Sequence, residues 1–229
     1  MFSGYGATIL DGAWLTLQLA LLSMVLAIAL GLIGAAFRLS PIRWLAWCGD
    51  LYATVIRGVP DLVLILLIFY GGQALVNWVA PMFGYEDYID LNPFISGVGT
   101  LGFIFGAYLS ETFRGAFMAI PKGQGEAGFA YGMSGLQVFF RIQVPQMIRL
   151  AIPGFTNNWL VLVKATALIS VVGLQDMMFK AKQASDATRE PFTYFLAVAA
   201  LYLVVTSVSL LLLRMLERRY SVGVKVADL

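Results

Sequence analysis

The sequence predicts an all-α integral membrane protein: one domain, residues 1–229, with five membrane-spanning helices. Of its 229 residues 60% are hydrophobic and only 12% are charged, whereas about a quarter of the residues in a soluble domain are charged. The apolar residues form five long blocks, and each block approaches or exceeds the roughly 20 helical residues that a bilayer requires. No repeat, long linker or soluble domain separates the blocks. We therefore expect a single membrane domain.

The five expected spans cover about residues 12–37, 59–81, 92–115, 148–175 and 191–214. The first has no charged residue and no Lys or Arg before it, and its apolar run is longer than that of a signal peptide, so we expect it to be retained. Pro81 is expected to end the second span. The fourth contains a single charged residue, Lys164, and has Pro153 near its start.

The basic residues predict the orientation of the chain. Ten Lys and Arg fall in the loops after the first and third spans and after the fifth, whereas the loops on the other side carry three. Because short cytoplasmic loops are enriched in Lys and Arg, we expect the N-terminus outside and the C-terminus in the cytoplasm. The loop after the second span, with Glu86, Asp87 and Asp90, is then external and acidic.

Between the third and fourth spans lies a glycine-rich segment, residues 120–145, that is neither a simple loop nor an apolar span. Phe129, Met133 and Leu136 recur in it at helical spacing, with Gly132 on the same face. We expect a short helix whose small residues allow a partner to approach closely. The alternative is an amphipathic helix in the lipid headgroups, but such helices usually carry several Lys or Arg on the polar face.

The composition excludes several kinds of catalytic site. The chain has no His and one Cys, Cys48, so Ser-His-Asp sites and cysteine-built metal sites are excluded. No Gly-Lys dipeptide is present for a phosphate-binding loop, and a net charge of +2 does not indicate nucleic acid. A membrane enzyme would depend on Lys164 and Ser170, whose spacing of six does not place them on one helical face. A passive channel would need a repeated ring of polar residues.

Two acidic residues near span ends are candidate ligands or structural groups. Asp61 follows Arg57-Gly-Val-Pro60, and in the first turn of a helix it is stabilised by the helix dipole. It is therefore a helix cap, a partner of Arg57 or a binding residue. Glu111 and Arg114 are three residues apart, a spacing at which side chains pair on a helix. Glu111 is accordingly a structural ion-pair residue or a binding residue.

Lys164 lies inside the fourth span. A charge there costs of order 2.5–3.5 kcal/mol on insertion scales, so it should face a pathway, a partner or the bundle interior. Asn157 lies seven residues earlier, on the same helical face, next to Asn158. This polar stripe either lines a translocation path or holds helices together.

A family resemblance follows from the glycine-rich segment. Glu126-Ala127-Gly128, then Gly132, then Ile142 and Pro145 resembles the Glu-Ala-Ala loop of the membrane subunits of ATP-binding-cassette importers, with Gly128 in place of the second Ala. The resemblance implies the type I importer permease fold. It also implies that residues 120–145 form a cytoplasmic coupling helix that seats in a groove of an ATPase subunit.

Further matches run through essentially the whole chain. Arg57-Gly-Val-Pro, Glu111-Thr-Phe-Arg-Gly, Ile120-Pro-Lys-Gly and Lys164-Ala-Thr-Ala-Leu resemble the polar amino-acid branch. The resemblance is strongest to Q-type permease subunits for histidine, lysine, arginine and ornithine. Asp61 stands where Leu is common in the branch.

The resemblance implies a subunit of the bacterial inner membrane that is not itself an enzyme and imports basic amino acids by alternating access. The implied partners are a second homologous permease, an ATPase dimer that binds ATP and Mg, and an external, periplasmic binding protein. No cofactor is expected in this chain. Glutamine or glutamate is the alternative substrate. The candidate substrate-binding residues are Asp61, Glu111, Asn157 and Lys164.

Overall fold

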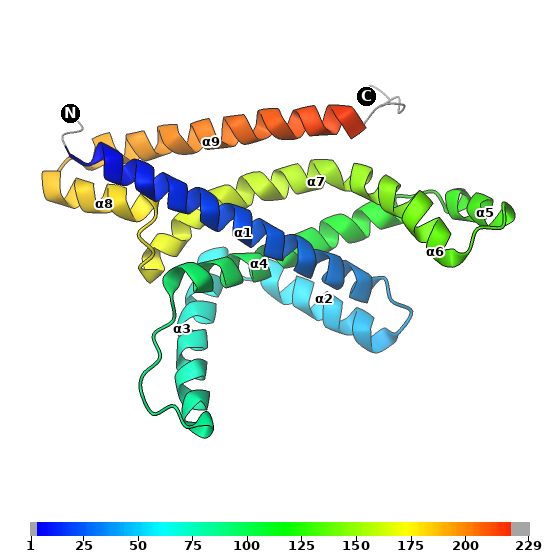
Figure 1. The fold of residues 1–229 in the computed structure, drawn as a ribbon, viewed down its shortest axis with the longest axis horizontal. Coiled ribbons are helices and arrows are strands. Elements are labelled where there is room, and N and C mark those ends of the chain that lie inside the picture. The colour runs from blue at the N-terminus through cyan, green and yellow to red at the C-terminus, as the bar shows by residue number, and fades with distance from the viewer. Residues whose placement is uncertain (1–3, 221–229) are drawn as a thin grey trace.

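The computed structural model describes residues 4–220, and the regular structure in that range is entirely helical (Figure 1). By length and composition, five helices in the described range can cross a membrane: Gly6–Arg38, Asp61–Phe83, Pro93–Met118, Gly135–Val172 and Pro191–Arg219. They coincide with the five predicted spans, apart from shifts at their ends. The all-α, five-span fold class is therefore confirmed.

The centre of the bundle is the packing of α1 (Gly6–Arg38) against α4 (Pro93–Met118), two helices that cross at glycines. A Cβ added to Gly31 would lie 2.7 Å from the Cβ of Leu109, and one added to Gly106 would lie 2.8 Å from the Cβ of Leu30. Small residues let the helix backbones approach closely, which is how membrane helices gain packing contacts without a hydrophobic driving force. Leu109 is fully buried at this crossing.

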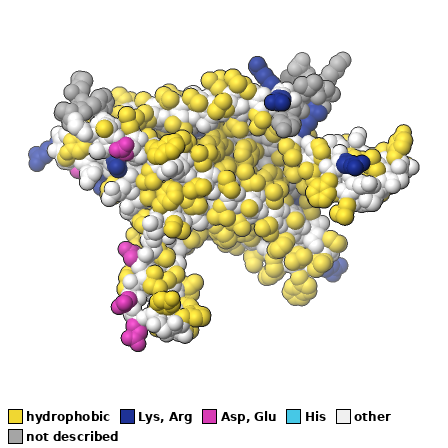
Figure 2. Space-filling model, in the orientation of Figure 1, with side chains coloured by type: hydrophobic (Ala, Val, Ile, Leu, Met, Phe, Trp, Pro, Cys, Tyr) yellow, Lys and Arg dark blue, Asp and Glu magenta, His cyan; other side chains and the backbone are white. Residues whose placement is uncertain are grey.

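The second span, α3 (Asp61–Val79) with η1 (Ala80–Phe83), projects away from this body (Figure 1). Much of its apolar surface is exposed, including Leu67 and Trp78. The loop that follows folds back along α3, because the Asn77 side chain accepts the Ile89 N–H at 2.8 Å and donates to the Ile89 carbonyl at 2.9 Å. Figure 2 shows Asp and Glu side chains on this projecting arm.

Two helices, α2 and α8, lie between the predicted spans and were not expected. The helix α2 (Arg43–Gly58) lies beside α1 and α4 and buries Gly49, Ala53 and Ile56. The helix α8 (Met177–Thr188) packs against α1 and α9 (Pro191–Tyr220). Charged residues interrupt both segments, so neither forms an apolar block in the sequence.

The predicted fourth span, 148–175, differs most from the structure. Its helix begins much earlier, as α6 (Gly135–Val138), a π-helical turn η2 (Phe139–Gln143) and α7 (Val144–Ala165), and it ends in the 3₁₀ helix η3 (Thr166–Val172). The second half of the glycine-rich segment, residues 120–145, is therefore part of the fourth span. Only α5 (Lys122–Ala130) is a separate helix.

Candidate functional site

An ion-pair cluster joins α1, α2 and α4 at one end of the bundle. Glu111 lies 2.6 Å from Arg38, 2.6 Å from Arg114 and 3.4 Å from Arg57, measured between side-chain oxygen and nitrogen atoms. Arg38 also donates to Asp50 at 2.7 Å. The predicted pairing of Glu111 with Arg114 is confirmed, and both carboxylate oxygens of Glu111 are engaged by arginines.

A polar cavity opens beside this cluster, with a volume of about 390 Å³. Two of the predicted binding residues, Glu111 and Asn157, line it. The remaining lining residues come from α2, α4 and α7: Arg57, Tyr108, Thr112, Gly115, Leu150, Gly154 and Asn158. Its volume is within the range of about 300–1,000 Å³ typical of small-molecule pockets.

The wall of the polar cavity is fixed by contacts between α4 and α7. The Asn158 side chain donates to the Thr112 hydroxyl at 3.1 Å and to the Gly154 carbonyl at 2.8 Å. A Cβ at Gly154 would lie 2.6 Å from the Thr112 methyl group, so only glycine allows this approach without a shift. Asn157, by contrast, is exposed toward the cavity.

Asp61 lies at the first position of α3 and contacts the residues of the cavity wall. The Tyr108 hydroxyl donates to the Asp61 carboxylate at 3.3 Å, and Tyr108 itself lines the polar cavity. The N-cap residue of α3 is Pro60, so Asp61 belongs to the first turn and is not the N-cap itself. Among the described ion pairs, Arg57 contacts Glu111 rather than Asp61.

Lys164 is separate from the other three predicted binding residues. It lies at the penultimate position of α7, next to the start of η3, and does not line the polar cavity. Asn157 and Lys164 are both exposed and share the helical face that their spacing predicts. The structure therefore places Glu111 and Asn157 in the lining of one cavity, with Asp61 in contact with the lining residue Tyr108. Lys164 lies farther along the helical face of Asn157.

The glycine-rich segment does not form the single helix face predicted from Phe129, Met133 and Leu136. Gly132 has a φ of +78°, in the left-handed region, and it ends α5 instead of continuing it. The Gly132 N–H donates to Phe129 and the Met133 N–H donates to Gly128, as in a glycine-terminated helix. The prediction that Gly132 lies on the same helical face as these residues was therefore wrong, because helical spacing alone does not reveal a left-handed turn.

Gly128 occupies the closely packed position instead. It is buried, and a Cβ added there would lie 2.7 Å from the tip of Ile142 and 2.9 Å from a methyl group of Val138. These contacts fold α5 onto the helix formed by α6 and η2. The spacing between Gly128 and Ile142 in the sequence is thus the signature of a contact within this chain.

The outer surface of the glycine-rich segment is largely apolar. Five large side chains on it are exposed: Phe129, Tyr131, Leu136, Phe139 and Phe140. Glu126 and Ala127 are also exposed, on the same short helix α5 as Phe129, while Pro145 is exposed in the first turn of α7. α5 and α6 project beyond the end of the bundle (Figure 1). This surface is free for a partner.

Sequence reasoning missed the long-range members of these sites. Arg38 and Tyr108 are 73 and 47 residues from the acidic groups that they contact, Glu111 and Asp61. No local spacing connects such residues. Thr112 could have been found, because it lies between Glu111 and Arg114, one helical turn from Tyr108.

A membrane-spanning helical bundle with a polar cavity between its helices and a projecting segment at one end is an architecture that suits a membrane transport subunit. Residues 16–222 match the family described as "Binding-protein-dependent transport system inner membrane component". The chain belongs to this family.

Several relatives and solved structures are similar over nearly the whole chain. The HisQ permease protein of the histidine/lysine/arginine/ornithine transport system of Salmonella typhimurium is 52% identical, with 100% of both chains covered. The arginine ABC transporter permease protein ArtQ of Escherichia coli is 36% identical, with 91% of this chain and 93% of ArtQ covered.

A crystal structure of an amino acid ABC transporter with histidines has a TM-score of 0.80 and 30% identity, and covers 94% of this chain and 95% of its own. An inward-facing MetNI methionine ABC transporter has a TM-score of 0.73 at 17% identity, covering 96% and 100%. The second similarity supports the fold alone. Together they confirm the predicted type I importer permease fold.

Proposed function

We propose that this chain is the permease subunit of an ATP-driven importer of basic amino acids in the bacterial inner membrane. The observation that carries the proposal is the polar cavity, which brings Glu111 and Asn157 together beside Asp61 in a chain of this family. The names of HisQ and ArtQ support the same substrate class.

The groups around the cavity suit an amino acid with a cationic side chain. Such a substrate needs an anionic partner for its side chain and a cationic or N–H partner for its α-carboxylate. Asp61 provides the carboxylate, which accepts a hydrogen bond from Tyr108 of the cavity wall. Arg57 lines the cavity and provides a guanidinium group. Glu111 acts mainly by positioning Arg57, because its own oxygens are paired with arginines.

The exposed surface of the glycine-rich segment is the proposed docking site for the ATPase. Glu126 and Ala127 face outward and contact the ATPase, while Gly128 packs against Ile142 inside the segment. Gly132 ends α5 in a left-handed turn and Pro145 lies in the first turn of α7, so these two residues set the course of the backbone. We assign the binding of ATP and Mg to the ATPase dimer. The segment and the residues just after it carry Lys122, Arg141 and Arg149, and basic loops favour the cytoplasmic side.

The exposed surfaces of the chain indicate where the second permease and the external binding protein would bind. The arm formed by α3, and the face with Asn157 and Lys164, are left uncovered in this chain, and we assign them to a second, homologous permease. The acidic loop after η1 lies on the side expected to meet the external binding protein. ATP-driven closure of the ATPases then moves the glycine-rich segments, and the permease pair alternates between outward and inward access.

The test is ATP-dependent uptake by the reconstituted importer, with all subunits present in proteoliposomes. Arginine, lysine, ornithine and histidine should enter in preference to glutamine and glutamate. Asn157→Leu, which places an apolar group in the cavity wall, should reduce uptake, whereas Val208→Leu, at an exposed position of α9 that does not line the cavity, should not. Faster uptake of glutamine than of the basic amino acids would indicate an importer of neutral amino acids. Flux without ATP would indicate a channel.

A further inference from the structure

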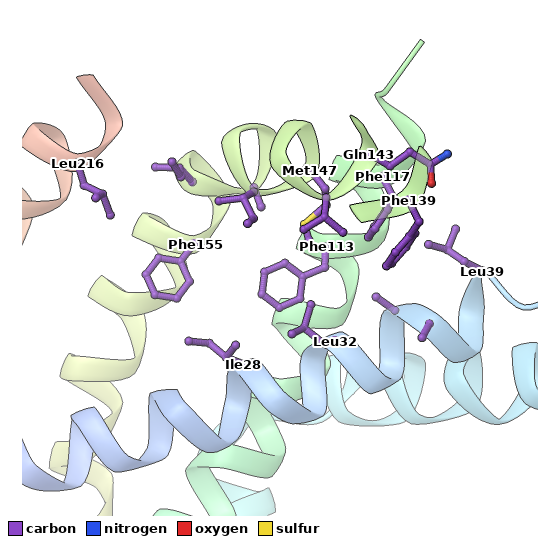
Figure 3. A pocket seen from close by; sticks show the side chains of 16 residues that line it. Ile28, Leu32, Leu39, Phe113, Phe117, Phe139, Gln143, Met147, Phe155 and Leu216 are labelled. Carbon is purple, nitrogen blue, oxygen red and sulfur yellow. The ribbon is translucent and has the colours of Figure 1, made fainter. Parts of the chain in front are cut away.

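The helices α4 and α7 line two cavities with different faces. With Phe113 and Phe155 they line a large cavity of about 890 Å³, whose lining is apolar except for Gln143 (Figure 3). With Thr112 and Asn158 they line the polar cavity described above. The contact between Thr112 and Asn158 therefore lies at the wall of the polar cavity.

The Asn158 side chain is held by hydrogen bonds that fix the orientation of its amide group. Its nitrogen donates to the Gly154 carbonyl at 2.8 Å and to the Thr112 hydroxyl at 3.1 Å. A carbonyl oxygen can only accept, so the nitrogen of Asn158, and not its oxygen, must face Gly154. The Thr112 hydroxyl donates its one proton to the Tyr108 carbonyl at 3.3 Å, so it accepts from Asn158. Both N–H groups of the amide are therefore engaged within the chain.

The amide oxygen of Asn158 has no such partner. It accepts no hydrogen bond from the described residues, and these residues do not enclose it. Because Asn158 lines the polar cavity, the oxygen is accessible to a ligand in that cavity. The neighbouring Asn157 also lines the cavity, but no hydrogen bond to a described residue fixes its amide. Asn158 thus provides a hydrogen-bond acceptor of fixed direction.

The groups already assigned to the substrate leave its α-ammonium group without a partner. In the function proposed above, Arg57 binds the α-carboxylate and Asp61 binds the cationic side chain. An ammonium group has three N–H donors and no acceptor, so it needs oxygen atoms around it. The oxygens of Glu111 already lie 2.6 Å from two arginines, whereas the Asn158 oxygen is accessible and without a partner among the described residues.

From these contacts we infer that the Asn158 oxygen accepts a hydrogen bond from the α-ammonium group of the bound amino acid, and that Thr112 positions it for this role. The inference rests on the proposed function and adds to it the recognition of a group that all amino acids share. Asn158 selects amino acids over compounds that have the same side chain but lack the α-amino group, whereas Asp61 selects among side chains.

The test is equilibrium binding of radiolabelled arginine to the assembled permease–ATPase complex in nanodiscs, in competition with 5-guanidinopentanoate, which is arginine without its α-amino group. Asn158→Leu should weaken arginine binding roughly 10- to 100-fold, the range for a hydrogen bond to a charged group. It should leave the binding of 5-guanidinopentanoate nearly unchanged. An equal weakening of both compounds would show that Asn158 only joins α4 to α7, and would overturn the inference. Unchanged arginine binding would overturn it as well.

Two threonines provide a matched pair of variants for the positioning role. Thr112→Val removes the hydroxyl that accepts from Asn158 and should weaken the binding of arginine, but not of 5-guanidinopentanoate, about 2- to 10-fold, the value of one neutral hydrogen bond. Thr156→Val in α7 should change neither, because Thr156 does not line the polar cavity and its hydroxyl has no hydrogen-bond partner among the described residues. Equal arginine binding by the two proteins would overturn the positioning role of Thr112. If Asn158→Leu fails to assemble, Asn158→Ser takes its place, because a serine hydroxyl can still donate to the carbonyl four residues earlier.

Glutamine separates this inference from the proposed substrate class. It has the α-ammonium group but an uncharged side chain, and glutaramate is glutamine without its α-amino group. Tighter binding of glutamine than of arginine by the wild-type complex would refute the proposed substrate class. Even then, Asn158→Leu should weaken the binding of glutamine and spare that of glutaramate, and an equal effect on both would overturn the role of Asn158.

Discussion

Replacing Asp61 with Asn tests the proposed substrate site most directly. The change keeps the shape of the side chain and its contact with the Tyr108 hydroxyl, at 3.3 Å in the structure, but removes the charge. A hydrogen bond to a charged group contributes about 1.5–3 kcal/mol, which corresponds to roughly 10- to 100-fold in affinity. Uptake of arginine or lysine should fall by that factor. The accompanying loss of the charge–dipole interaction with α3 costs only about 0.3–1 kcal/mol.

The assay is competitive uptake of arginine and histidine by the reconstituted importer above about pH 7.5, where histidine, with a pKa of about 6.5, is mostly neutral. Arginine uptake should fall roughly 10- to 100-fold, and histidine uptake should be largely spared. Tyr108→Phe is the comparison variant: it keeps the charge of Asp61 and removes the hydrogen bond from Tyr108 to that carboxylate, which contributes about 1.5–3 kcal/mol as a bond to a charged group. An equal loss of arginine and histidine uptake would show that Asp61 has only a structural role. Unchanged uptake of both would refute its role in binding.

Three further predictions concern the coupling turn, the orientation and the pH dependence. Gly132→Ala should raise the conformational free energy of the left-handed turn by about 1–2 kcal/mol. It should therefore lower stimulated ATP hydrolysis while the amount of protein in the membrane stays normal. Gly123→Ala, in α5 with open space around it, should leave this hydrolysis unchanged. A cysteine at Glu86 should react with a membrane-impermeant thiol reagent in intact cells, and one at Gln124 should not; the reverse order would overturn the orientation. Burial raises the pKa of the Asp176 carboxyl from 3.8 to about 7. The folded chain therefore retains a proton that the unfolded chain loses, and stability falls as the pH rises through this range. Asp176→Asn should flatten that slope of the thermal unfolding midpoint against pH, and a persisting slope would assign it to another group.

The spans were predictable because each is a long apolar block, and the helices between them were not. In α2, Asp50 breaks the hydropathy pattern, but in the structure it pairs with Arg38 of α1 at 2.7 Å. The charge is thus stabilised by a contact that no local pattern contains. In α8, Asp176 caps the helix by accepting the Phe179 N–H at 2.9 Å, which is a local signal and could have been found.

The candidate site was predictable only where its members share one helix. Glu111 and Arg114 pair across one turn, as their spacing indicates. The Asp61–Tyr108 contact joins residues 47 positions apart on different helices, so only the packing of α3 against α4 brings it about. The prediction that Gly132 lies on a helical face was wrong although it rested on local spacing. Its neighbours have helical spacing, but a glycine can also adopt the left-handed conformation that ends a helix.

The helix α4 connects the two proposed sites. Tyr108 at the polar cavity and Met118 at the end of α4 are ten residues apart, or about 15 Å along a straight helix, and α5 begins four residues after Met118. The cluster around Glu111 ties this part of α4 to α1 and α2 through Arg38 and Arg57. A force on α5 would therefore move α4 together with the wall of the polar cavity, rather than bend the chain between them. The ion-pair cluster therefore determines how strongly movement of the ATPase is coupled to movement of the cavity wall. Its effect on this coupling should exceed that of any residue that contacts substrate.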